Sequence, residues 1–324
     1  MHASAKACAP SEVFFCPDGE GFYMAKPKYS KPAITVSDQA KLLLKRGLNK
    51  SSEKNIETKL NTVSYYRLSG YMIPYLDRKS NIFYSGTKWK YIWNDYCLDK
   101  NLRSLLFDAI GELEITLRTR MIYSMSLAHG SRWYEDSSLF YKNALLQNDL
   151  KEIKSHWNRS KEVFVLHYNN NYDTSFLPPA WMIFETTTFG TLSKYFENLD
   201  ATLVARNQIV DFFGFNKSSA KVLISWFRHL NVVRNICAHH SRLFSKTFVV
   251  CPIISKSKFN NYLTLLPAQN KLYATVCIIQ TLLKETGSNF DFSNKLHKIL
   301  KSANKRDLQL MGIPKNWKHQ KLFS

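Results

Sequence analysis

Apolar side chains recur at steps of three and four residues along most of this sequence, which is the pattern of helices buried on one side. The longest run lies between Trp89 and His129, and its apolar positions are Leu102, Leu105, Leu106, Ala109, Ile110, Leu113, Leu117 and Met121. This stripe predicts a single long helix, and Gly130 stands where such a helix ends.

The same period predicts a series of shorter helices. They are expected at 37–47, with Ser37 as the N-cap, and at 52–61, 143–158, 180–199, 203–213, 218–244, 260–266 and 271–285. Residues 167–179 are expected to form a loop, and the apolar residues within 246–255 indicate a short extended segment. Because nearly every strong signal has the helical period, the fold class is expected to be mainly α.

Charge narrows the class of partner. The chain has 324 residues, of which 45 are Lys or Arg and 25 are Asp or Glu, so its formal net charge is +20. A cationic surface of this size attracts polyanions and releases their counterions on binding, which makes nucleic acid the leading partner class. The 45% apolar content argues against a disordered chain.

The sequence also indicates a compartment. It contains no run of about 20 apolar residues that could span a membrane, and its N-terminus lacks the pattern of a secretory signal. Six cysteines are scattered without a CxxC pair, which favours reduced thiols over a disulfide framework. The protein is therefore expected to be soluble and cytoplasmic, with no membrane partner.

The C-terminal residues are strongly basic. The segment 295–324 contains eight Lys or Arg and a single Asp, together with Trp317. Such a run is a solvated face or a surface that follows a nucleic-acid backbone and stacks on its bases. The candidate RNA-binding residues are Arg242, Lys298, Lys301, Lys305, Arg306, Lys315, Trp317 and Lys318.

The densest group of reactive side chains is the string RNICAHHSR, residues 234–242, at the polar end of an apolar helix. Asn235 and His239 are four residues apart and share a helix face, and Arg234 lies beside Asn235 around the axis. A guanidinium that binds phosphate oxygens and an imidazole that titrates near neutral pH are the groups needed to cleave a phosphodiester.

Other interpretations of this group remain open on the residues alone. Adjacent histidines project about 100° apart on a helix and no HExxH motif accompanies them, so neither a metal nor another cofactor is expected. Cys237 and His239 face different directions, which disfavours a thiol nucleophile with its base. A plain set of polar residues at a helix end is as good an explanation as catalysis. Likewise, Glu114 and Arg118, four residues apart, are consistent with a simple surface ion pair.

Several ordered strings resemble one known family. LFDAIGELEITLRTR, PPAWMIFETTTFGTLSKYFENL and WFRHLNVVRNICAHHSRLF are similar to the Abi-like family of bacterial abortive infection proteins, of the AbiD and AbiF type. KPAITVSDQAKLLLKRGL and VSYYRLSGYMIPYL resemble the N-terminal signature of that family. The family is in turn similar to the HEPN superfamily, which consists of α-helical ribonucleases with an Arg, a polar residue and a His after four to six intervening positions.

The resemblance implies a fold and a division of the chain. It implies a HEPN-like helical bundle with an N-terminal helical extension and a basic C-terminal tail. The expected divisions are a flexible arm at 1–30, the N-terminal helical region of the family at 31–87, the helical core at 88–290 and the tail at 291–324.

The resemblance also implies site residues. The motif residues are Arg234, Asn235 and His239, and His240 also satisfies the looser spacing, so the choice of histidine stays open. Glu114 and Arg118 occupy polar positions of the family motif LEITLR and are expected to support the site.

The implied activity is RNA cleavage without a metal, in which the 2′-hydroxyl of the substrate attacks the adjacent phosphorus. The implied assembly is a homodimer with a composite active site. The alternative is an RNA-binding defence module that is held latent by, or works with, a small structured non-coding RNA.

Overall fold

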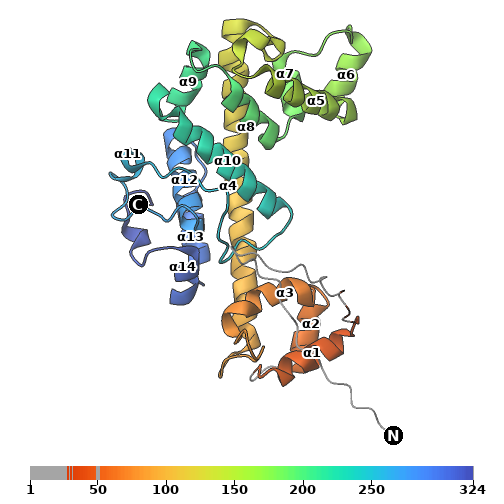
Figure 1. The fold of residues 1–324 in the computed structure, drawn as a ribbon, viewed down its shortest axis with the longest axis vertical. Helices are drawn as coiled ribbons and strands as arrows, with labels where there is room; N and C mark the ends of the chain where they lie inside the picture. Colours follow the sequence, from red (N-terminus) through yellow and green to blue (C-terminus); the bar gives the residue numbers. More distant parts are fainter. Residues whose placement is uncertain (1–27, 29, 31, 49–51, 324) are drawn as a thin grey trace, which may run out of the picture.

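One long helix organises the molecule (Figure 1): α4 (Trp89–His129) contacts helices from the N-terminal, middle and C-terminal parts of the chain. The computed structural model describes residues 28, 30, 32–48 and 52–323. Within these residues the chain forms fourteen α-helices, and its β-structure is limited to isolated bridges. The mainly α fold class is therefore confirmed, and the bounds of α4 are those that its apolar stripe predicted. The predicted arm, residues 1–30, lies almost wholly outside the described residues.

Three short helices pack at one end of α4: α1 (Val36–Lys45), α2 (Glu53–Leu60) and α3 (Tyr65–Met72). A hydroxyl side chain caps the N-terminus of each, as hydroxyl groups do for the free N–H groups of a first turn. The cap of α1 is Thr35, whose Oγ1 accepts from the Asp38 N–H at 3.1 Å, so the expectation that Ser37 is the cap is wrong.

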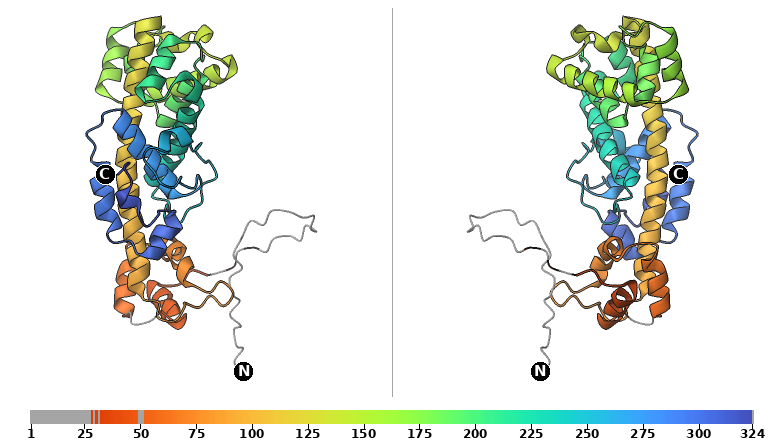
Figure 2. Two further views of the ribbon diagram at one scale, coloured as in Figure 1. Left: turned by 90° about the vertical axis from the view of Figure 1, so that its left-hand side faces the viewer. Right: turned by 90° about the vertical axis from the view of Figure 1, so that its right-hand side faces the viewer.

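The opposite end of α4 carries a second group of helices, and the side views show that α4 joins the two groups (Figure 2). This group consists of α5 (Asn143–Arg159), α6 (Val163–Asn171), α7 (Ala180–Ile183), α8 (Phe189–Asn198) and α9 (Val204–Phe212). The loop predicted at 167–179 is wrong in its first part, because α6 continues to Asn171. Tyr168 of α6 is buried with its ring centroid 5.7 Å from that of Trp157, and this packing stabilises the helix.

The single helix predicted at 180–199 is divided in two. Thr187 has an extended backbone, with φ −89° and ψ 137°, and Thr188 caps α8 by accepting from the Thr191 N–H at 3.3 Å. Threonine hydroxyls that bond to the nearby backbone compete with helix formation, which explains the break at the Thr186 to Thr188 run.

The helix α10 (Ala220–Ala238) crosses α4 and is fixed against α12 (Leu272–Glu285) by a buried histidine. The His229 ring nitrogens lie 2.7 Å from Thr275 Oγ1 and 2.8 Å from the Val250 carbonyl oxygen. Burial lowers the pKa of His229, so the ring is neutral and serves as a hydrogen-bonding link. α12 is apolar and buried over most of its length, but no helix of the described chain is long and apolar enough to cross a membrane.

One prediction between α10 and α12 is wrong. The segment 246–255, expected to be extended, is neither helix nor paired strand in the described structure. The helix expected at 260–266 is replaced by the shorter α11 (Lys256–Phe259), which begins where the Ser255 hydroxyl accepts from the Lys258 N–H and ends at the fully buried Phe259.

The basic C-terminal segment is part of the packed body. α13 (Phe292–Leu300) lies against α4, and α14 (Lys305–Met311) follows it. Trp317 is only 1% exposed, and its ring centroid lies 4.6 Å from that of His297 and 5.7 Å from that of Phe323. The core therefore continues past residue 291, because the segment places its apolar side chains inward and its lysines outward.

Replacement of Trp317 by alanine is expected to lower the free energy of unfolding by about 3 to 5 kcal/mol, because it empties a buried site that a large ring fills. Denaturant titration of the purified protein measures this loss. Lys318→Ala, at the exposed neighbouring position, is the control and should change stability by about 0.5 kcal/mol or less. A Trp317→Ala protein as stable as its parent would contradict the burial of this side chain.

Candidate active site

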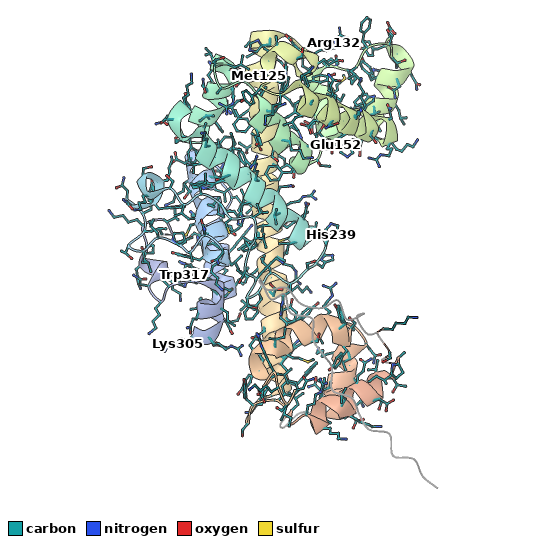
Figure 3. The ribbon with its side chains drawn as sticks, in the orientation of Figure 1. Met125, Arg132, Glu152, His239, Lys305 and Trp317 are labelled. Carbon is teal, nitrogen blue, oxygen red and sulfur yellow. The ribbon has the colours of Figure 1, made fainter. Side chains whose placement is uncertain are left out.

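The reactive motif lies where α10 ends. His239 is the C-cap residue, with φ −85° and ψ 9°, and its N–H donates to the Asn235 carbonyl at 3.0 Å. His240 follows with a positive φ of 53°, which ends the helix. Asn235, His239 and His240 are all exposed, and His239 stands at the free end of α10 (Figure 3). The helix therefore presents two imidazoles in succession just beyond its last turn.

Arg234 is held between an aromatic ring and a carboxylate of α4. Its guanidinium lies 5.4 Å from the Phe107 ring centroid, and its Nε lies 3.9 Å from Glu114 Oε2. The Nε–H group is buried and has no hydrogen-bond partner among the described residues. The Nη groups form no hydrogen bond with the described residues, and the side chain is 34% exposed, so an anionic ligand can reach the outer part of the guanidinium.

Glu114 joins two arginines from different helices. Its Oε1 accepts from Arg118 Nη2 at 2.9 Å, while Oε2 faces Arg234. The same Arg118 nitrogen also donates to the Thr187 carbonyl at 3.0 Å, at the break between α7 and α8. The structure thus brings the sequence-predicted pair Glu114 and Arg118 to Arg234, with Arg118 engaged in structural contacts. One carboxylate faces two cations, so the group keeps a positive charge.

A buried carboxylate anchors the chain directly after the motif. Asp99 of α4 accepts from the Phe244 N–H at 2.6 Å and from the Leu243 N–H at 3.2 Å. It also accepts from the Tyr71 hydroxyl at 2.5 Å and from Arg103. Burial raises the pKa of Asp99, and these four donors act against the rise. The segment that carries the histidines is therefore fixed to α4.

The helix α3 provides a second attachment. Arg67 donates to the His240 carbonyl, and Arg242 donates to the Gly70 carbonyl. A Cβ at Gly70 would lie 3.1 Å from Arg242 Nη1, so glycine permits this close approach. The expectation that Arg242 binds RNA is not supported, because its guanidinium is engaged with the backbone of α3.

A pocket of about 360 Å³ lies beside the motif, on the side of Phe107. Its lining residues are Lys100, Arg103, Ser104, Phe107, Cys237, Ala238 and His240. Phe107 thus contacts Arg234 and also faces the pocket that His240 lines. Burial raises the pKa of Cys237 to about 12, so this thiol stays protonated and is a poor nucleophile. No three His, Cys, Asp or Glu side chains of the described residues are grouped as a metal site requires.

The predicted RNA-binding residues of the C-terminal segment differ in their exposure and in their contacts. The lysines of the set are exposed: Lys298, Lys301, Lys305, Lys315 and Lys318. Arg306 is paired with Asp95 at 2.7 Å and Asp307 at 3.0 Å, so it is a structural residue. Trp317 is buried and offers no ring face to a base, which corrects its predicted role. In the view of Figure 3, Lys305 and Trp317 lie across α4 from His239.

Sequence reasoning missed Asp99, Phe107 and Arg67. Asp99 and Arg103 are charged positions on the buried stripe of α4, four residues apart, and this is a signal of a buried ion pair. Phe107 and Arg67 carry no comparable signal, because their roles depend on contacts with residues more than a hundred positions away.

A second pocket, of about 1050 Å³, lies between α5, α8 and α10. Asp149 of α5 lines it, is 6% exposed, and has no hydrogen-bond partner among the described residues. Burial raises the pKa of Asp149 to about 6, with Glu152 and Glu197 adding to the rise and Lys194 opposing it. An ionised, nearly buried carboxylate without a donor is costly to the folded chain.

Comparison with known proteins identifies one family. The family model described as "Abi-like protein" matches residues 58–245, which is more than half of the chain and includes α4 and the motif at the end of α10. No curated protein and no solved structure matches the chain.

Asp99→Asn is expected to lower the free energy of unfolding by about 3 to 5 kcal/mol, because it leaves the Arg103 cation buried without its counter-charge. Thermal or denaturant unfolding measures the change. Asp108→Asn, an exposed position on the same helix, should be nearly neutral. Equal stability of the two variants would show that Asp99 does not anchor the motif.

Asp149→Asn should stabilise the protein at neutral pH. The folded-state pKa is raised above the unfolded value, so the ionised carboxylate destabilises the native state as pH rises from about 4 to 6. The neutral amide removes this cost, which is on the order of 2 to 3 kcal/mol above pH 6 and vanishes below about pH 4. Denaturant unfolding of both proteins across this pH range measures the difference in their free energies of unfolding. A difference that does not change with pH would contradict the prediction.

Proposed function

The chain belongs to the Abi-like protein family, which supports a role in abortive infection, and we propose that it acts in this role as a metal-independent endoribonuclease of the HEPN type. The observation that carries the proposal is the geometry at the end of α10. A partly exposed arginine stands five and six residues before two exposed imidazoles, and the segment that carries the imidazoles is fixed to α3 and α4. A fixed cation and a free imidazole are what phosphodiester cleavage requires.

In the proposed reaction the 2′-oxygen of the substrate forms a bond to the adjacent phosphorus, and the bond from phosphorus to the 5′-oxygen breaks. One imidazole accepts the proton of the 2′-hydroxyl, and a protonated group supplies one to the departing 5′-oxygen. Arg234 stabilises the extra negative charge of the pentacoordinate phosphorane. The products end in a 2′,3′-cyclic phosphate and a 5′-hydroxyl.

We assign the proton transfer to His239. Asn235 lies one turn before it on the same face, where its amide can orient the ring. His240 lines the smaller pocket with Lys100, so we assign these two side chains to holding the phosphate. Glu114 positions Arg234, and Arg118 positions Glu114 through a 2.9 Å bond.

We further propose that two copies of the chain form the active site. The sequence contains one copy of the motif, and a composite site needs two. α4 exposes Ile115, Tyr123 and Leu127, at 59%, 62% and 86%, which is apolar surface that a second copy would cover.

His239→Ala and Arg234→Ala are each expected to reduce cleavage of single-stranded RNA about 10² to 10⁴-fold, because they remove the proton carrier and the main stabilising charge. His240→Ala should have the smaller effect. The assay follows labelled RNA in the presence of EDTA, with unfolding curves to show that each variant remains folded. Lys221→Ala, an exposed position at the opposite end of α10, is the matched control and should cut normally.

Three outcomes would contradict this mechanism: a strict need for a divalent metal, products without a cyclic phosphate, or full activity of both Arg234→Ala and His239→Ala. If His239→Ala keeps full cleavage activity and His240→Ala loses it, the roles assigned to the two histidines would be exchanged. Copurified small RNA together with no cleavage of added RNA would favour the alternative, a latent RNA-binding module. The exposed lysines of the C-terminal segment are a cationic surface suited to that role, and one of them, Lys305, lies across α4 from His239 in Figure 3.

A further inference from the structure

The larger pocket opens on the same side of α10 as the proposed proton carrier. Asn231 of the pocket, Asn235 and His239 follow one another at four-residue steps, so they lie along one helix face. Eight residues of helix separate Asn231 from His239 by about 12 Å. A single strand of RNA bound at His239 can therefore extend to the pocket, and Glu152 on its wall lies on the same side of α4 as His239 (Figure 3).

The lining of this pocket has no net formal charge, although the protein as a whole is strongly basic. Lys142, Lys194 and Arg228 line it, and so do three acidic residues, Asp149, Glu152 and Glu197. Arg228 Nε donates to Glu197 at 2.6 Å, and Lys194 lies 3.5 Å from Glu152. Arg228 and Lys194 are therefore paired, and the Lys142 ammonium lies 5.7 Å from the Tyr141 ring centroid, so the pocket is poorly suited to phosphate. It fits a ligand that is polar but uncharged.

Hydrogen-bonding groups without partners line the same pocket. Within the described residues, the side chains of Asp149, Asn148 and Asn231 form no hydrogen bond. Gly190 lies against Asn231, and a Cβ there would be 3.2 Å from the Asn231 amide nitrogen. Asp149 is the most telling of these groups, because the residue is 6% exposed and lines the pocket, while its carboxylate oxygens accept no hydrogen bond from the described residues and are not sealed off from the pocket.

We propose that this pocket binds an unpaired guanine base of the RNA strand, with the Asp149 carboxylate accepting from the guanine N1–H and N2 amino groups. Guanine is the one RNA base with two adjacent donors on its pairing edge, and they match the two oxygens of a carboxylate. Adenine, cytosine and uracil each place an acceptor beside a donor, which a carboxylate repels. Tyr141, 75% exposed at the pocket, offers a ring on which the base stacks.

This inference deepens the proposed function and rests on it for RNA as the ligand. It assigns sequence preference to a site separate from the histidines. The nuclease would cut near guanines, with Asp149 as a specificity residue and His239 as the catalytic one.

The test measures binding without cleavage. His239→Ala protein is titrated into fluorescein-labelled oligoadenylate that carries one central guanosine, one central inosine or neither, and anisotropy reports the affinity. The guanosine RNA should bind about tenfold more tightly than the other two, since inosine lacks the N2 amino group. Asp149→Asn added to this protein should abolish the preference. Asp211→Asn, an exposed position on α9 outside both pockets, should retain it.

Equal binding of the three RNAs, no binding of any, or a preference that survives Asp149→Asn overturns the guanine site. A guanine preference that depends on Asp149, in a protein whose parent form cuts no RNA, would support the pocket and overturn the nuclease. If the parent protein cuts RNA but shows no base preference, the nuclease proposal would be supported and the guanine site overturned. The two proposals therefore fail separately.

Discussion

The buried carboxylate of Asp99 is the contact on which the arrangement of the motif depends. It lies on α4, the axis of the fold, and accepts hydrogen bonds from the backbone of Leu243 and Phe244, close after the two histidines. A charge in this position is costly, and Arg103 and the Tyr71 hydroxyl must also be present to offset that cost. The motif at the end of α10 is therefore held by residues of α3 and α4 that lie far from it in the sequence.

The course of the long helices could be predicted from the sequence, whereas their interruptions could not. α4 follows its apolar stripe from Trp89 to His129 because one face of it is buried throughout. The break at Thr187 and the start of α11 are decided by hydroxyl groups that bond to the local backbone, and the hydrophobic periodicity does not register them. Trp317 was predicted to be exposed for RNA binding because it lies in a basic segment. The net charge of a segment does not say which of its side chains face the core, and Trp317 is buried.

The candidate site was predictable only in part. The spacing of Asn235 and His239 indicates a shared helix face, and the family motif indicates Glu114, which the structure places 3.9 Å from Arg234. The bonds from Arg67 to His240 and from Arg242 to Gly70 span more than 170 residues, and no local pattern encodes them. Asp149 did leave a signal, since it shares the buried stripe of α5 with Leu146 and Ile153, where a charged residue is unusual.

The bond from Arg67 to the His240 carbonyl and the bond from Arg242 to the Gly70 carbonyl have a thermodynamic consequence. They exist only when α3 is seated against the end of α10, so the order of the histidine segment and the seating of α3 are linked. By reciprocity, any ligand that orders the histidine segment tightens α3 by the same free energy, and any contact that displaces α3 loosens the segment equally. The helix α3 and the histidine segment thus form one cooperative unit, although they lie in different parts of the sequence.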